Sequence, residues 1–97
     1  MPFDLEILEE AKFEIEEAFH FYESKQLGLG VYFLENLYER FNSISTDPLK
    51  YKIKRSPFRE ALLSKFPHLV IFEVFDEKIL VYSVFHTSRN PIKKPKK

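Results

Sequence analysis

Two stretches in the first half of the chain repeat apolar residues at helical spacing. The first runs from Glu9 to about Lys25, and its apolar positions are Ala11, Ile15, Ala18, Phe19 and Tyr22. The second ends at Thr46, and its apolar positions are Val31, Leu34, Leu37, Tyr38, Phe41 and Ile44. Such spacing gathers apolar residues on one side of a helix. The pattern therefore predicts two amphipathic helices, each with one face for a core.

The segments around these helices contain signals for their ends. Gln26 to Gly30 holds both glycines of the chain, which weaken a helix and readily form turns. Asp47-Pro48 ends the second helix, because the residue before a proline is pushed out of helical geometry. Helices joined by so short a link are expected to pack as an antiparallel hairpin. Phe3 to Leu8, which precedes them, is short and loosely alternating, and we expect a strand there.

After Pro48 the pattern changes to segments rich in branched and aromatic residues, which are typical of strands. These segments are Tyr51 to Arg55, Arg59 to Phe66, Leu69 to Phe75 and Ile79 to Phe85. Phe66-Pro67-His68 and Asp76-Glu77-Lys78 are the expected turns. The predicted fold class is α+β: an N-terminal strand, an antiparallel helix hairpin, then a three- to four-stranded, mainly antiparallel sheet. Residues 90–97, with four Lys and two Pro, are expected to form a mobile tail.

Length and composition narrow the class of protein. The chain has 97 residues, which fits a single domain over 1–97, and 44% of them are hydrophobic, which is enough for a packed core. The absence of cysteine excludes disulfides, thiolate metal sites and thiol nucleophiles. The N-terminus lacks the basic start and apolar run of a secretory signal, and no stretch approaches the length of a membrane span. We therefore expect a cytoplasmic protein without a membrane partner.

Charge is distributed unevenly along a chain whose net charge is zero. Residues 1–48 hold eleven Asp or Glu against three Lys or Arg, whereas residues 49–97 hold four against twelve. Such a chain can neutralise itself across an internal interface, or it can present a basic face to an anionic partner. Both interpretations stay open at this stage.

The basic residues of the second half are the first candidates for chemistry. Arginine in particular can hold a phosphate or a carboxylate through two parallel hydrogen bonds. The simpler interpretation is a solvated sheet face. The residues concerned are Lys50, Lys52, Lys54, Arg55, Arg59, Lys65 and Arg89.

The three histidines and one aromatic residue are weaker candidates. His86 ends an apolar strand and could move protons near neutral pH, although a structural role in the loop is the simpler one. His20 with Glu16 one turn earlier could share a metal, but two ligands at one spacing are weak evidence. His68 follows Pro67 in a predicted turn, where local packing or hydrogen bonding is expected. Phe13 lies on the polar side of the first helix and marks either a partner surface or a single exposed aromatic.

No phosphate loop, nucleophile elbow or metal-ligand array is present, so no cofactor or metal is expected.

Three sequence motifs together carry a resemblance to a known family. They are Gly28-Leu29-Gly30, Arg59-Glu60-Ala61-Leu62-Leu63-Ser64-Lys65-Phe66-Pro67 and Val84-Phe85-His86-Thr87-Ser88-Arg89-Asn90-Pro91. In this order, after a strand and an acidic helix, they resemble the RelE/ParE toxin superfamily over nearly the whole chain. The pattern is closer to the ParE-like branch. The sequence departs from that pattern at His68, at Glu73 and at Thr87-Ser88.

The resemblance implies the toxin of a type II toxin–antitoxin system, of the kind linked to plasmid stabilization. It implies a cognate antitoxin whose segment wraps the toxin, in a homodimer or a heterotetramer with antitoxin. ParE-like proteins inhibit DNA gyrase and are not known to be catalysts. RelE-like proteins are mRNA interferases that cut message in the ribosome. A relative that binds antitoxin without being toxic is a third possibility, and whether the protein is an enzyme stays open.

The resemblance also assigns residues. Arg59 matches the superfamily's sheet arginine, Lys65 a basic strand position, and His86 and Arg89 the motif at the end of the last strand. If the protein is an endoribonuclease, these four are its catalytic residues, with Arg59 and Lys65 stabilising the phosphate and His86 as general acid or base. If it binds only, the residues that contact the target or antitoxin are Lys52, Lys54, Arg55, Arg59, Lys65 and Arg89.

Overall fold

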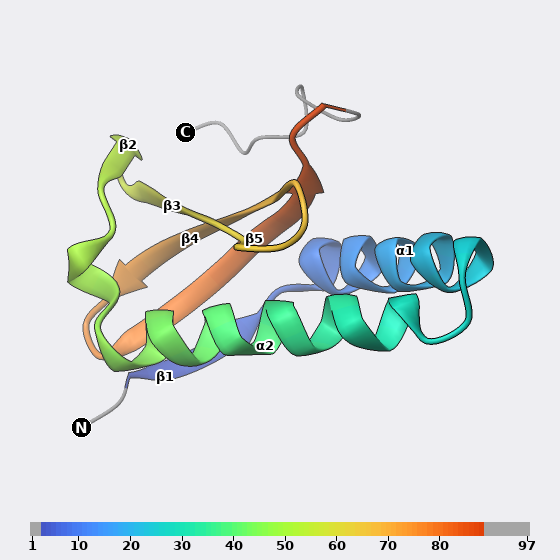
Figure 1. Ribbon diagram of the computed structural model, residues 1–97. Coiled ribbons are helices and arrows are strands. Elements are labelled where there is room, and N and C mark those ends of the chain that lie inside the picture. Colours follow the sequence, from blue (N-terminus) through green and yellow to red (C-terminus); the bar gives the residue numbers. More distant parts are fainter. Residues whose placement is uncertain (1–2, 89–97) are drawn as a thin grey trace.

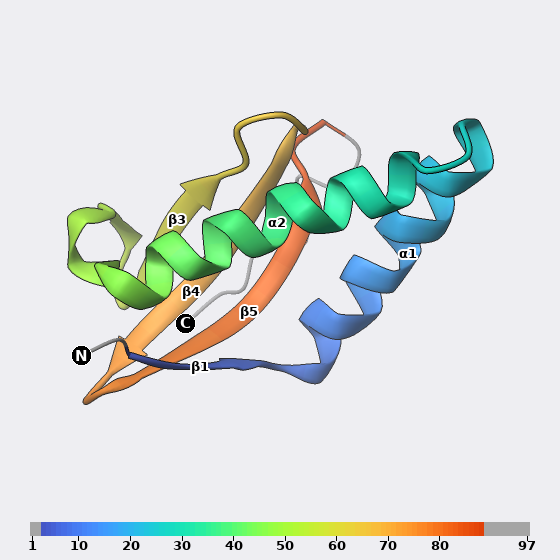
Figure 2. The same cartoon turned by 60° about the horizontal axis from the view of Figure 1, so that its bottom comes forward.

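A five-stranded mixed sheet carries both helices of the protein on one face (Figures 1 and 2). This computed structural model describes residues 3–88. The elements are β1 (Asp4–Ile7), α1 (Glu9–Lys25), α2 (Leu29–Thr46), a 3₁₀ turn (Pro48–Lys50), β2 (Ile53–Arg55), β3 (Phe58–Leu62), β4 (His68–Phe75) and β5 (Lys78–His86). The strand order is β1-β5-β4-β3-β2, with β1 parallel to β5 and the other pairs antiparallel. The α+β class and the order of elements are confirmed, and β1 adds a fifth strand to the predicted sheet.

The helix hairpin forms as predicted, and α1 has the expected bounds. Helix α2 begins slightly earlier than expected, at Leu29. Gly28 has a φ of 90°, which favours glycine, and Gly30 lies so close to α1 that a Cβ there would be 2.7 Å from the carbonyl oxygen of Phe19. The Glu23 carboxylate accepts hydrogen bonds from the N–H groups of Gly28 and Gly30, each at 2.9 Å. A glutamate of α1 therefore caps the positive end of α2.

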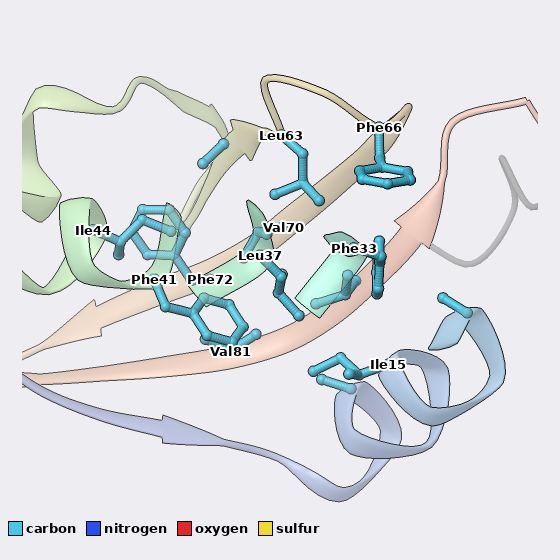
Figure 3. Close-up of a cluster of buried hydrophobic side chains, with 14 of the residues drawn as sticks. Ile15, Phe33, Leu37, Phe41, Ile44, Leu63, Phe66, Val70, Phe72 and Val81 are labelled. Carbon is cyan, nitrogen blue, oxygen red and sulfur yellow. The ribbon is translucent and has the colours of Figure 1, made fainter. Parts of the chain in front are cut away.

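The main hydrophobic core lies between the helices and the sheet (Figure 3). Helix α2 faces it with Phe33, Leu37, Phe41 and Ile44. The predicted apolar face of α2 was wrong at Val31 and Tyr38, which are 50% and 52% exposed, and it omitted Phe33, which is fully buried. The reason is that apolar residues cover an arc of α2 wider than its contact with the sheet. The row that contains Val31 and Tyr38 is turned away from the sheet.

The loop between β3 and β4 is longer than predicted. Strand β3 ends at Leu62 rather than at Phe66, and Leu63 closes the loop by donating its N–H to the carbonyl of His68 at 3.0 Å. His68 was predicted in the turn but is the first residue of β4, where it is paired with His86. The second turn is confirmed at Asp76-Glu77, where Asp76 has a φ of 57°.

A carboxylate completes the edge of the sheet where β1 stops. Strand β1 ends at Ile7, and beyond Val81 it no longer pairs with β5. There Glu14 of α1, which is buried, accepts hydrogen bonds at 2.8 Å from the backbone N–H of Val84 and from the hydroxyl of Ser83. Glu14 thus takes the place of a strand for this part of β5.

Two of the predictions concern the C-terminal end of the chain. Arg89 and the predicted tail at 90–97 lie outside the described residues. Within residues 3–88, neither helix has the length and apolar character needed to cross a membrane.

Candidate functional site

The two histidines at the end of the central strands lie side by side. His68 on β4 and His86 on β5 are register partners, and their ring centroids are 5.2 Å apart. His68 is 2% exposed, and its Nε2 lies 3.0 Å from the Tyr22 hydroxyl. His86 is only partly buried, and its Nδ1 accepts the N–H of Ser88 at 3.1 Å. The predicted packing role of His68 therefore agrees with its position, and His86 is the histidine that solvent or a partner can reach.

Aromatic rings surround this histidine pair on the side of the helices. Phe33 and Tyr22 pack against His68 with ring centroids 4.9 and 5.7 Å away. Phe66 packs against both of these rings, with centroids 5.3 and 4.8 Å away. Aromatic packing, and not only the β3–β4 loop, therefore holds the histidine pair in place at this end of the sheet.

Lys65 lies in the loop that leads to His68, at the same end of the sheet. Its backbone N–H donates to Oδ1 of Asn36 on α2 at 3.1 Å, and its Nζ lies 5.3 Å from the centre of the Tyr32 ring. The pKa of Lys65 is raised, first by its hydrogen bond with Tyr32, and the carboxylate of Glu39 contributes further. Lys65 is exposed, and because its pKa is raised it stays charged at any physiological pH.

Arg59 is fixed in a different part of the sheet. Its Nη1 donates to the backbone carbonyl of Tyr51 at 2.7 Å, and its register partner on β4 is Phe72. Phe72 is four residues along β4 from His68, the partner of His86, so Arg59 and His86 are separated by about 13 Å along the sheet. The structure brings Lys65 and His86 to one end of the sheet and does not bring Arg59 to them.

The remaining basic candidates form the edge of the sheet. Lys52, Lys54 and Arg55 are exposed on and beside β2, which has no strand on its outer side. Within residues 3–88 these three side chains pair with no carboxylate; the ion pairs found there are Lys12 with Glu9 and Lys78 with Glu6. Internal neutralisation by the acidic helices therefore does not reach this edge. A row of uncompensated cations on an edge strand suits an anionic partner.

The weaker metal candidate has no support in the part of the chain that is described. His20 is exposed, and together with Glu16 it lines a hollow of about 580 Å³ between α1 and α2. Residues 3–88 contain no group of three or more potential metal ligands. Phe13 is 57% exposed, so it lies on the surface as its place on the polar side of α1 predicts.

Sequence reasoning missed the residues that hold the basic side chains in place. The carbonyl oxygen of Tyr51 accepts a hydrogen bond from Arg59. The hydroxyl oxygen of Tyr51 accepts a hydrogen bond from Arg40 at 3.2 Å. Asn36, which is buried on α2, holds the β3–β4 loop through Lys65 and Ser64. A signal for Asn36 was available, because it lies beside Leu37 and at i+3 from Phe33, and a buried amide requires partners.

Two comparisons with known proteins agree with this architecture. The family model for the ParE toxin of the type II toxin–antitoxin system, parDE, matches residues 5–91. A solved structure, described as the chromosomal ParDE TA system from P. aeruginosa, superposes with a TM-score of 0.77 at 11% identity, covering 87% of this chain and 95% of that chain. At this identity the second likeness shows the fold alone. No curated protein sequence matches the chain. With nearly its whole length matched by the family model and its fold shared with a ParDE protein, the chain belongs to the ParE toxin family of type II toxin–antitoxin systems.

Proposed function

We propose that this protein inhibits DNA gyrase by binding, and that a cognate antitoxin neutralises it. The observation that carries the proposal is the separation of the candidate catalytic residues. General acid–base catalysis needs its groups within hydrogen-bond reach of one substrate. Arg59 is held by Tyr51 near the start of β3, while His86 is at the end of β5. This arrangement favours a binding protein over a nuclease, and membership of the ParE family supports the same target.

The basic edge is the surface that we expect to meet gyrase or its DNA. Lys52, Lys54 and Arg55 are exposed and pair with no carboxylate in the described chain. Their attraction to an anionic surface is long-ranged and decreases with salt.

Induction of the chain without antitoxin tests the proposal. Growth should stop, and DNA breaks that require active gyrase should accumulate. The triple change of Lys52, Lys54 and Arg55 to Gln should reduce these breaks, whereas the control change of Lys12 and Lys25 on α1 to Gln should leave them unchanged. Growth arrest with intact DNA would contradict the proposal. Normal growth with tight antitoxin binding would instead indicate a non-toxic relative.

A ribosome-dependent endoribonuclease is the second candidate. The observation in its favour is that His86 is partly exposed at the same end of the sheet as the Lys65 loop. In a translating extract this activity would cut message at codon positions and would collapse with His86→Ala or Arg59→Ala. Intact message rules this candidate out.

A further inference from the structure

Strand β2 is held only weakly by its own pairing in the sheet. It has three residues, Ile53–Arg55, and all of them are exposed. It pairs with β3 alone, at the outer end of the sheet (Figure 1), and the register shifts between its two paired positions. So short an edge ladder contributes little stability by itself. Other contacts are therefore needed to hold β2 and its cations in one place.

The side chain of Tyr51, two residues before β2, supplies such contacts. Its hydroxyl accepts from Nη1 of Arg40 at 3.2 Å and lies 2.7 Å from Oγ of Ser43, both on α2. A phenol can accept one hydrogen bond and donate another, so both contacts can exist at the same time. The ring packs edge-on against the buried Phe72 of β4, with centroids 5.8 Å apart. Tyr51 therefore joins the segment before β2 to α2 and to the centre of the sheet.

The backbone of Tyr51 adds two more connections. Its carbonyl oxygen accepts from Nη1 of Arg59 on β3 at 2.7 Å. Its N–H donates to the carbonyl oxygen of Pro48 at 3.3 Å, which closes the 3₁₀ turn, and Pro48 is fully buried. The segment that leads into β2 is thus fixed at its start by Pro48 and at its end by Tyr51.

Tyr51 also lies among positive charges that no carboxylate neutralises. Neither Arg40 nor Arg59 forms an ion pair with a carboxylate between residues 3 and 88. Nζ of Lys50 lies 5.4 Å from the centre of the Tyr51 ring. Like charges repel one another, so these cations do not stay together through charge. Hydrogen bonds to the neutral oxygens of Tyr51 hold both arginines beside β2.

We propose that Tyr51 is a positioning residue for partner binding, which holds the basic edge of Lys52, Lys54 and Arg55 in the arrangement that meets an anionic surface. A surface that is already ordered loses less entropy on binding, so it binds more tightly than a loose surface with the same charges. The inference rests on the proposed function, because it takes the anionic surface of the gyrase–DNA complex to be the partner. It adds an uncharged residue that neither composition nor the family resemblance assigned.

The first test uses the full chain alone. Tyr51→Phe keeps the ring and the carbonyl and removes only the hydroxyl. In ¹⁵N relaxation measurements the order parameters of the amides at 52–55 should fall. The Nε–Hε group of Arg59 should lose order too, although its own acceptor is unchanged. Tyr38→Phe, on the exposed row of α2, is the control and should change neither. Equal order at 52–55 in Tyr51→Phe and in the unchanged chain overturns the proposal.

The second test measures binding to the gyrase–DNA complex at several salt concentrations. Tyr51→Phe should weaken binding by about fivefold or more, mainly through faster dissociation. The slope of log affinity against log salt should stay the same, because no charge is removed. The triple change of Lys52, Lys54 and Arg55 to Gln should instead make this slope smaller. Rates measured well below the melting temperature of each variant concern the folded chain, which separates positioning from a loss of stability. A changed slope in Tyr51→Phe overturns the proposal.

Ser43→Ala is the milder variant should Tyr51→Phe fail to fold, which thermal melting detects. It removes one of the two partners of the hydroxyl, so smaller changes in the same direction are expected, and no change in order or dissociation would overturn the proposal. If the unchanged chain binds gyrase–DNA and Tyr51→Phe dissociates at the same rate, this inference fails and the proposed function stands. If the unchanged chain neither binds gyrase–DNA nor causes gyrase-dependent breaks, the proposed function fails and the inference fails with it.

Discussion

Val70 and Ile71 are neighbours in β4 and both are buried, yet they belong to different hydrophobic clusters. Alternate residues of a strand point to opposite faces, so Val70 faces the helices and Ile71 faces away from them. On the helix side the cluster extends through α1, α2 and four strands. On the opposite face Ile71 packs with Phe58 and Phe85 and with the partly buried Leu69 and Tyr82.

The two faces of the sheet differ in how completely their apolar side chains are covered. The face under the helices is closed by side chains from distant parts of the sequence, which makes it the larger source of stability. On the opposite face Leu62 and Phe75 are 55% and 60% exposed. A carboxylate accepts a hydrogen bond from a side-chain hydroxyl on each face: Glu14 accepts from Ser83 under the helices, and Glu73 accepts from Tyr82 on the open side.

The largest effect should come from the helix-covered face. Phe33→Ala should lower the free energy of unfolding by about 3–5 kcal/mol, because Phe33 is fully buried between Tyr22, Phe66 and His68 and its loss leaves a cavity. The control Tyr38→Ala, on the exposed row of the same helix, should cost less than about 1 kcal/mol. Urea unfolding measures both. Equal losses would contradict the assignment of the two rows of α2.

A smaller loss is expected on the open face. Phe58→Ala should lower the free energy of unfolding by about 2 kcal/mol, since Phe58 contacts a small cluster and water can reach the space that it leaves. Leu62→Ala is the matched control on the same strand and face, and it should cost less than about 1 kcal/mol because Leu62 is already exposed. A loss at Phe58 as large as at Phe33 would show that this face is closed as firmly as the other.

The carboxylate under the helices should matter less than either ring. Glu14→Gln should cost about 1–2 kcal/mol, because an amide oxygen still accepts from Ser83 and Val84 but more weakly than a carboxylate does. Hydrogen exchange at the Val84 amide should become faster in this variant. Glu17→Gln, exposed on the same helix, should leave both measurements unchanged.

Much of this fold could be predicted from the sequence because local signals agree with the tertiary structure. The bounds of α1 and the turn at Asp76-Glu77 followed from periodicity and turn residues. The buried row of α2 could not be predicted in this way, because α2 is apolar over a wide arc. Only its contact with the sheet determines that Phe33 is buried and Val31 is exposed. Glu14 was also missed, although its spacing of three from Ala11 and four from Ala18 places it on the buried stripe.

The candidate site was less predictable, because it depends on how far apart residues are in space. Arg59 and Lys65 lie in one of the motifs that carry the family resemblance, and His86 lies in another. Register then separates Arg59 from His86, which periodicity cannot reveal. Tyr51 and Arg40 become important only through hydrogen bonds that join the loop after α2 to the sheet.

The smallest expected effect concerns the open-face pair of Tyr82 and Glu73. Burial raises the pKa of Tyr82, and its 2.9 Å hydrogen bond to Glu73 raises it further. A pKa that is higher in the folded state stabilises the fold at pH values below the unfolded value of about 10, and this contribution is lost as pH rises through the folded value. Tyr82→Phe should therefore cost less than about 1 kcal/mol at neutral pH and should remove part of the alkaline decline in stability. Tyr38→Phe is the exposed control, and urea unfolding between pH 7 and about pH 11 distinguishes the two. An alkaline decline that is the same in Tyr82→Phe and in the unchanged chain would show that the open face does not hold this phenol in its neutral form.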